Sequence, residues 1–374
     1  MDSHEASATH WLLSTVAVIG LMLASLLLPE LSRAAQAQSS YVIQVSIDGL
    51  GSEYLKPLLA GGQTPNLARL VHEGASTMNA RADYDYTITL PNHTSMLTGR
   101  PVSDKFGDVI SGHHWTTNTL SADDVTLHSN RGFYVAGVFD VAHDHGLSTA
   151  LYASKAKFVL YDNSWNAVNG ALDDVAPDNG RDKIDTFVNI DLNATAVFSA
   201  FRMNELSHPA RYVFIHFDSP DTAGHVNGWG SAPYTRSVML VDGFIGQLFS
   251  MIDQSVQLRG NTYLVLTADH GGTGFGHSDA MLAINYTVPF VVWGPGIPTG
   301  ADLYALTGSA VSEPGTTRVD YGLDNQQPIR NGDAGNCALR LLGLPAIPGS
   351  RLDHLQNVCQ LHATMQTFMS IIAR

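Results

Sequence analysis

Short apolar runs alternate with amphipathic segments along the chain from Tyr41 onward. Five runs have the length and β-branched composition of buried strands, namely Val42–Ile47, Leu147–Tyr152, Tyr212–Phe217, Thr262–Thr267 and Val288–Trp293. Three other segments have the spacing of helices, namely Pro65–His72, Pro233–Ile252 and Gly332–Leu344. Strands separated by helices are typical of a mostly parallel sheet with helices on both faces. The pattern therefore predicts an α/β fold.

One segment interrupts this alternation. Tyr161–Lys183 is polar and rich in Asn, Asp and Gly, a composition typical of surface loops. We therefore expect a small surface cap or excursion there. The chain contains no internal repeat and no low-complexity tract. Its length would allow one large domain or two small ones, and we expect a single domain over residues 38–374.

The N-terminal segment differs from the rest of the chain. An apolar run from Trp11 to Leu28 is followed by Ala35-Gln36-Ala37, which fits the small-residue pattern of signal-peptide cleavage. We interpret residues 1–37 as a signal peptide. The first ten residues contain no Lys or Arg, so an uncleaved membrane anchor is the alternative, since the run is long enough to span a bilayer. Either way we expect the rest of the protein outside the cytoplasm, periplasmic or secreted.

Composition narrows the range of functions. With 44% hydrophobic and 14% charged residues, the 374-residue chain has the composition of a packed globular protein. Its formal net charge of −14 argues against binding a nucleic-acid polymer, which requires a basic face. A small phosphate ester remains open, because bound metal ions supply local positive charge. The only two cysteines, Cys337 and Cys359, either form a disulfide in an oxidising compartment or remain buried free thiols.

Acidic residues follow three of the predicted strands. Asp48 ends the first strand, Asp218 and Asp221 follow Tyr212–Phe217, and Asp269 ends Thr262–Thr267. Ligands of open α/β sheets bind beyond the carboxyl ends of the strands. A single Asp-Gly after a strand is adequately explained as a turn, but several carboxylates at one sheet edge repel one another unless a cation lies between them. The pattern therefore predicts a metal site.

Histidines accompany these carboxylates. Asp221 precedes His225 by four residues, which lets both side chains reach one cation from a single turn. Asp269 is followed directly by His270, two glycines and then, within a Gly-rich stretch, His277. Three Asp and three His form a mixed set that suits Zn²⁺, Mn²⁺ or Fe better than Mg²⁺ or Ca²⁺. A surface Asp–His pair is the alternative explanation for the first motif alone.

A candidate nucleophile precedes a predicted helix. Pro91 is placed as the first helical residue and Gly99 as the stop, so Thr89 lies at the helix N-terminus, where backbone N–H groups favour a phosphate. A Thr hydroxyl needs a base or a metal ion to ionise it. In isolation the segment would be better explained as a helix-capping Thr without a chemical role.

These motifs, in this order, resemble the alkaline phosphatase superfamily, and most closely its nucleotide pyrophosphatase/phosphodiesterase (type I phosphodiesterase) branch. The motifs are Asp48-Gly49, Thr89-Leu90-Pro91-Asn92-His93 ahead of Thr98-Gly99, Asp221-x-x-x-His225 and Asp269-His270-Gly271. The resemblance runs from about Val42 to the end of the last predicted helix. It implies an alkaline phosphatase-like fold and a phosphoric ester hydrolase.

The resemblance also implies two divalent metal ions and a role for each motif residue. One metal would be held by Asp221, His225 and His277, and the other by Asp48, Asp269 and His270, with the Thr89 oxygen between them. Zinc is expected, with manganese or iron as alternatives. Thr89 would form a covalent phospho-enzyme, which water then hydrolyses. Asn118 matches an asparagine that binds a phosphate oxygen in the family.

Two departures from the family pattern bear on these roles. Asp104–Gly112 is longer than the usual link before the asparagine, and His277 follows His270 after only seven residues, as though an insertion were lost. We expect a small-molecule phosphate ester, most simply a phosphodiester. A phosphomonoester, a phosphonate and a non-catalytic metal- or phosphate-binding role are alternatives. A sulfatase is disfavoured, because its nucleophile is Cys or Ser in a different motif.

Overall fold

The computed structural model describes residues 40–104, 110–175, 178–322 and 326–360. In this part of the chain eight strands form one sheet in the order β4-β3-β5-β1-β6-β7-β2-β8. The strands are β1 (Tyr41–Ile47), β2 (Ala75–Arg81), β3 (Thr149–Ala153), β4 (Thr186–Asn189), β5 (Tyr212–Phe217), β6 (Thr262–Thr267), β7 (Thr287–Trp293) and β8 (Ala301–Asp302). The predicted strands Tyr212–Phe217 and Thr262–Thr267 coincide with β5 and β6, and the other three differ by one or two residues.

The sheet is mostly parallel, as predicted. Strand β1 pairs in parallel with β5 on one side and β6 on the other, while β7 runs antiparallel to both of its neighbours. Every β1 residue except Tyr41 is buried. A strand buried on both faces is typical of a parallel sheet that helices cover on both sides.

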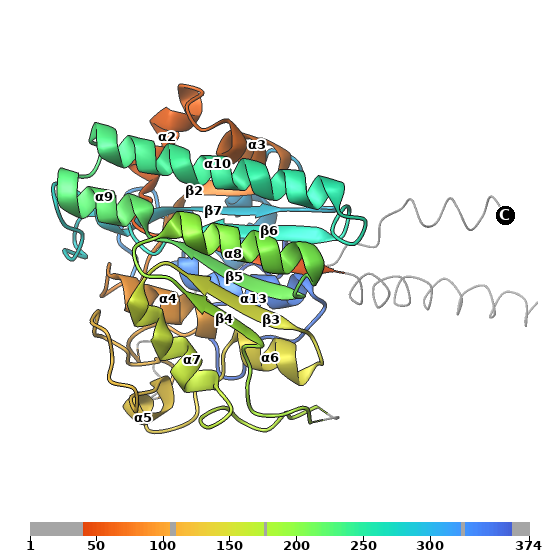
Figure 1. The fold of residues 1–374 in the computed structure, drawn as a ribbon. Helices are drawn as coiled ribbons and strands as arrows, with labels where there is room; N and C mark the ends of the chain where they lie inside the picture. Colours follow the sequence, from red (N-terminus) through yellow and green to blue (C-terminus); the bar gives the residue numbers. More distant parts are fainter. Residues whose placement is uncertain (1–39, 105–109, 176–177, 323–325, 361–374) are drawn as a thin grey trace, which may run out of the picture.

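Helices cover both faces of this sheet (Figure 1), which confirms the predicted α/β class. Helices α3, α8 and α10 lie on one side, and α4, α6, α7 and α13 lie on the other. The helices are α2 (Ser52–Ala60), α3 (Pro65–Glu73), α4 (Thr89–Thr98), α5 (Leu127–Arg131), α6 (Val138–Asp144), α7 (Val159–Trp165), α8 (Ala194–Ser207), α9 (Ser219–Asn227), α10 (Ala232–Gln254), α11 (Ala283–Tyr286), α12 (Leu303–Thr307) and α13 (Ala334–Leu341). Short 3₁₀ turns occur at η1 (Ala156–Phe158), η2 (Gly308–Ala310) and η4 (Asn331–Asp333).

Helix α4 begins two residues earlier than predicted. Thr89, not Pro91, is its first residue, and Ile88 before it is extended. The missing N–H of proline is tolerated throughout the first turn, so Pro91 does not mark the start of the helix. Gly99 ends the helix as predicted, in the left-handed conformation with φ of 61° that glycine adopts readily.

The expected surface excursion is shorter than Tyr161–Lys183. Tyr161 and Trp165 are buried in α7, and the irregular turns start after this helix. Lys183 at the far end is also buried, because its ammonium pairs with the carboxylates of Asp144 and Asp173. The polar composition of this segment did not predict the helix at its start or the buried ion pairs at its end.

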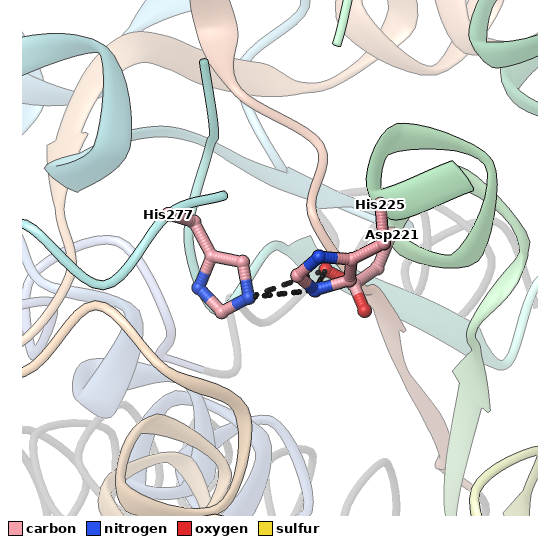
Figure 2. A group of neighbouring side chains, drawn as sticks. All are labelled: Asp221, His225 and His277. Atoms are coloured by element: carbon pink, nitrogen blue, oxygen red, sulfur yellow. Dashed lines mark hydrogen bonds and ion pairs between the residues drawn. The ribbon is translucent and has the colours of Figure 1, made fainter. Parts of the chain in front are cut away.

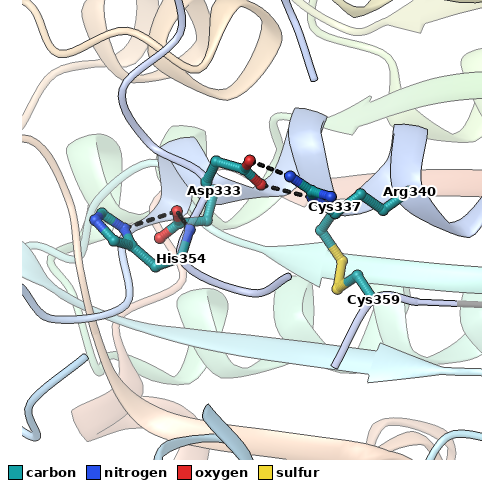
Figure 3. Close-up of a disulfide and its surroundings, with 6 residues drawn as sticks. Asp333, Cys337, Arg340, His354 and Cys359 are labelled. Atoms are coloured by element: carbon teal, nitrogen blue, oxygen red, sulfur yellow. Dashed lines mark hydrogen bonds and ion pairs between the residues drawn. A yellow bond between two sulfur atoms is a disulfide. The ribbon is translucent and has the colours of Figure 1, made fainter. Parts of the chain in front are cut away.

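A disulfide joins Cys337 in α13 to Cys359 near the end of the described chain (Figure 3), with the two sulfurs 2.07 Å apart. Of the two alternatives for these cysteines, the disulfide is therefore confirmed and the pair of free thiols is excluded. The same region holds an ion pair between His354 and Asp333, whose Nδ1 and Oδ1 atoms lie 2.9 Å apart. The segment after α13 is therefore tied back to the domain.

No helix within the described residues is both long and apolar enough to cross a membrane. The predicted signal peptide or anchor, residues 1–37, lies outside those residues.

Candidate active site

Three carboxylates meet at one edge of the sheet. Asp48 follows β1, Asp269 follows β6, and Asp221 lies in the first turn of α9 directly after β5. Because β1 is hydrogen-bonded between β5 and β6, the carboxyl ends of all three strands share that edge. All three side chains are buried. The predicted convergence of acidic residues is therefore present.

The first group of candidate ligands consists of Asp221, His225 and His277 (Figure 2). Asp221 Oδ1 lies 3.5 Å from His225 Nε2 and 3.6 Å from His277 Nε2, and the two imidazole nitrogens are 3.1 Å apart. Two ligands of a tetrahedral Zn²⁺ at about 2.0–2.1 Å from the metal are separated by about 3.3 Å. The three atoms therefore have the spacing of one face of such a tetrahedron.

The second group is centred on His270. Its Nε2 lies 3.1 Å from Asp269 Oδ2, 3.6 Å from Asp48 Oδ1 and 3.9 Å from Asp221 Oδ1. The atoms that lie close enough together to share one ion are those of Asp48, Asp221 and His270. Asp221 thus contacts both groups, a bridging position that the sequence did not predict.

Backbone carbonyls set the tautomer of the three imidazoles. The Nδ1 of His225 donates a hydrogen bond to the carbonyl of Phe275. In the same way His277 donates to the carbonyl of Thr87, and His270 donates to the carbonyl of Gly271. In the neutral ring each Nε2 then carries a lone pair directed into the site. The lone pairs of His225 and His277 face each other, an arrangement that a shared cation stabilises. Metal-ligating histidines donate their other nitrogen in this way.

Four buried polar atoms of this site have no hydrogen-bond partner, namely Asp48 Oδ1, Asp221 Oδ1, Asp269 Oδ2 and His270 Nε2. The other oxygen of each carboxylate is occupied. Asp269 Oδ1, for example, accepts the N–H groups of Gly49 and His270. Leaving a buried polar atom unpaired costs about 1–3 kcal/mol, and more when it is charged. These residues fit a divalent cation, because the four unpaired atoms are all potential metal ligands.

The charges of these groups also suit a cation. Burial and the nearby charge of His270 lower the pKa of His277 to about 3, so this ring stays neutral and able to donate its lone pair. Burial opposes protonation of His270, but Asp269 and the other carboxylates outweigh it and raise its pKa to about 9. The position of His270 Nε2 therefore attracts positive charge.

Thr89 lies beside this cluster as the first residue of α4. All ten α4 residues are buried, and Asn92 fixes the preceding loop by donating from Nδ2 to the carbonyls of Tyr86 and Ile88. The Thr89 hydroxyl oxygen is 3.4 Å from Lys155 Nζ. Lys155 in turn contacts carboxylates of the metal-ligand groups. Lys155 thus links the Thr89 hydroxyl to two of the candidate ligands.

Asn118, the candidate phosphate-binding residue, also reaches this site. Its Oδ1 accepts the backbone N–H of Leu90 at 3.0 Å, and Lys157 Nζ donates to the same oxygen at 2.9 Å. The amide of Asn118 therefore lies beside the residue that follows Thr89. The long Asp104–Gly112 link does not carry it away from the site.

Two neighbours of the ligands were not identified from the sequence. His216 in β5 lies 2.9 Å through Nε2 from Asp48 Oδ2, and Lys155 lies 2.6 Å from Oδ2 of both Asp48 and Asp221. The sequence features that could have indicated them are a histidine within an apolar strand and a lysine two residues after strand β3.

Comparison with known proteins places this chain in a family. Residues 42–289 match the family model described as type I phosphodiesterase/nucleotide pyrophosphatase. Rat ectonucleotide pyrophosphatase/phosphodiesterase family member 3 is 24% identical over 236 residues, which are 62% of this chain and 24% of the rat protein. GPI ethanolamine phosphate transferase 1 of Aspergillus oryzae is 29% identical over 133 residues, 35% of this chain and 13% of that protein. The matches thus span a quarter or less of these relatives.

Solved structures share the fold. Murine ectonucleotide pyrophosphatase/phosphodiesterase 5 superposes with a TM-score of 0.55 at 14% identity, covering 85% of this chain and 99% of the murine chain. An alkaline phosphatase superfamily protein from Vibrio parahaemolyticus gives a TM-score of 0.52 at 16% identity, covering 83% of this chain and 68% of that one. With the family model matched over most of the described chain, this protein belongs to the type I phosphodiesterase/nucleotide pyrophosphatase family.

Proposed function

We propose that this protein hydrolyses phosphate esters at a centre of two divalent metal ions, with Thr89 as the nucleophile. The observation that carries the proposal is the set of four unpaired ligand atoms, two of which belong to carboxylates that contact Lys155. The ammonium of Lys155 lies 3.4 Å from the Thr89 hydroxyl. Family membership supports the same reaction class.

The metals we propose are zinc ions, with manganese or iron as alternatives, because the ligands are three imidazoles and three carboxylates. Asp221, His225 and His277 would hold one ion, and Asp48, Asp269 and His270 the other, with Asp221 close to both. Bound there, the ions would ionise the attacking hydroxyl and stabilise charge on the phosphoryl oxygens.

Thr89 is a better candidate nucleophile than its neighbour Thr87. The Thr87 hydroxyl donates a hydrogen bond to the carbonyl of His277, and this bond fixes the orientation of the hydroxyl. The Thr89 hydroxyl lies instead beside the ammonium of Lys155, which favours an ionised oxygen. A murine relative whose structure was solved with AMP is described as inactive when one threonine is replaced by alanine.

The proposed reaction has two steps. The Thr89 oxygen attacks phosphorus, the bond to the departing alkoxide breaks, and that alkoxide takes up a proton to leave as an alcohol. Water then attacks the phospho-threonine, releases the phosphate and returns a proton to the Thr89 oxygen. The basic side chain of Lys155 beside that oxygen stabilises its anionic form in both steps.

The substrate we propose is a small phosphate ester, and the family description makes a phosphodiester the first compound to test. A nucleic-acid polymer is not expected, given a net charge of −14. We also propose that the protein acts outside the cytoplasm. The Cys337–Cys359 disulfide and the apolar N-terminal segment support this location.

The experiment compares hydrolysis of a chromogenic phosphodiester and the matching monoester, before and after chelation. Activity that chelation removes and Zn²⁺ or Mn²⁺ restores supports the proposal. Thr89→Ala should bind the same amount of metal, keep the fold and lose turnover by about 1,000-fold or more, as removal of a nucleophile does. Thr87→Ala is the matched control. Full activity of Thr89→Ala would refute the assignment of the nucleophile.

A further inference from the structure

Two lysines from one connection lie near the start of α4, Lys155 at the Thr89 hydroxyl and Lys157 at Asn118. Lys155 follows β3 and Lys157 lies in η1, so both enter the site from the strand next to β5. Lys155 is nearly inaccessible to solvent, with 10% of its side chain exposed. Its ammonium lies 3.4 Å from the Thr89 hydroxyl, and Lys157 contacts Asn118 at 2.9 Å. Lys155 has a role in the proposed reaction, whereas Lys157 has none so far.

Lys155 does not compete with a metal ion for its ligands. It contacts the Oδ2 atoms of Asp48 and Asp221, whereas the Oδ1 atoms of both residues face the imidazoles and have no partner. The two carboxylates thus divide their oxygens between the imidazole side and the lysine side. The hydroxyl of Thr89 is reached from the lysine side.

Lys157 forms no ion pair with a described residue. Among the described residues, no carboxylate oxygen lies within 4.0 Å of its ammonium, which instead contacts only the carbonyl oxygens of Asn118. Burial and the charge of Lys155 lower the pKa of Lys157 to about 8, and the opposite effect of Asp48, Asp221 and Asp269 does not offset them. A half-buried ammonium without an ion-pair partner, bonded to the candidate phosphate-binding residue Asn118, is suited to an anionic ligand.

We propose that Lys155, Lys157 and Asn118 form a recognition site for the oxygens of a dianionic phosphate, so that phosphomonoesters are preferred over phosphodiesters. This inference rests on the proposed function. A monoester has a second pKa of about 6, so it carries nearly two negative charges at neutral pH and three terminal oxygens. A diester carries one charge and two such oxygens. Two ammonium groups in addition to the metal ions match the extra charge and oxygen of the monoester.

The test uses Lys157→Met in the full chain, because Lys157, unlike Lys155, does not contact the carboxylate ligands. Removal of one charge-assisted hydrogen bond should lower kcat/KM for a chromogenic monoester by about 10- to 100-fold. The loss for the matching diester should be smaller, so the monoester-to-diester ratio falls at least about tenfold. Lys157→Arg keeps the charge and should retain most of the ratio. Lys56→Met, at an exposed lysine on α2, is the matched control. An unchanged ratio in Lys157→Met would overturn the inference.

A binding measurement separates this inference from the proposed function. In the Thr89→Ala background, calorimetry at pH 7.5 would compare inorganic phosphate with dimethyl phosphate, with and without Lys157→Met. Phosphate affinity that falls about tenfold or more while dimethyl phosphate affinity changes less supports the lysine site, even if the wild type hydrolyses neither ester and the proposed function fails. Equal effects on both anions, or none, would refute the lysine site even if hydrolysis is confirmed.

Discussion

The imidazole of His216 and the carboxylate of Asp48 are joined by a 2.9 Å contact between Nε2 and Oδ2, and neither side chain is accessible to solvent. Asp48 immediately follows β1, and His216 lies in the neighbouring parallel strand β5. The contact fixes one oxygen of the carboxylate and directs the other toward His270. His216 is therefore a positioning residue for a candidate metal ligand.

His216→Gln should weaken metal binding and activity together by about 10- to 100-fold, as loss of a group that orients a metal ligand typically does. Metal affinity measured by competition with a chelator, alongside kcat/KM, checks this. Added metal should restore part of the activity, which a purely structural defect would not allow. His72→Gln, at an exposed position on α3, serves as the control and should change neither quantity.

Asp269→Asn should lose metal as well as activity. Oδ1 of Asp269 already accepts two backbone N–H groups, so the amide would keep that oxygen in place and turn its NH₂ toward His270 Nε2. A donor at that position cannot ligate a cation. Elemental analysis of the purified variant should show less than the wild-type metal content, with Asp123→Asn on the surface as the control. Wild-type metal content in Asp269→Asn would refute its assignment as a ligand.

The Cys337–Cys359 disulfide should contribute to stability rather than to catalysis. It closes a loop with a sequence separation of 22, for which the chain-entropy model gives about 3 kcal/mol. Replacing both cysteines with alanine should lower the free energy of unfolding by about that amount, as measured by urea denaturation under conditions where unfolding is reversible. The kcat of the folded variant should match the wild type. A stability equal to that of the wild type would contradict this prediction.

The ion pair between His354 and Asp333 should make stability depend on pH. Burial would lower the pKa of His354, but the Asp333 carboxylate outweighs it and raises the pKa above its usual value. A raised pKa in the folded state contributes stability that is fully present below about pH 6.5, the unfolded value, and is lost as pH rises through the folded value. His354→Gln should therefore destabilise the protein more at pH 6 than at pH 9. Equal differences from wild type at both pH values would rule this contribution out.

Sequence patterns located the site because its ligands directly follow hydrophobic strands. The end of a buried strand can be read from composition, and parallel strands bring their carboxyl ends together, so Asp48 and Asp269 could be placed at one edge without coordinates. The pairing of His225 with His277 depends on a loop conformation, and only the family resemblance indicated it. The same holds for Asn118.

Two of the elements that the sequence did not predict, β2 and α8, have weak periodicity. Strand β2, Ala75–Arg81, is largely polar and pairs with an irregular register, so it lacks the apolar run that marked the central strands. Helix α8, Ala194–Ser207, combines small and polar residues with only a few buried ones. Tertiary contacts decide the structure of such segments. The position of Asp221, which contacts both groups of candidate ligands, likewise depends on how β5 and α9 pack against their neighbours.

Complete burial of α4 has a consequence for how the protein loses activity. The amides of a helix enclosed on all sides exchange with solvent only when the surrounding domain opens. Hydrogen exchange around Thr89 should therefore be among the slowest in the chain and report global stability. The geometry around its hydroxyl should then persist on heating until the whole sheet unfolds, so that thermal inactivation and thermal denaturation follow a single curve.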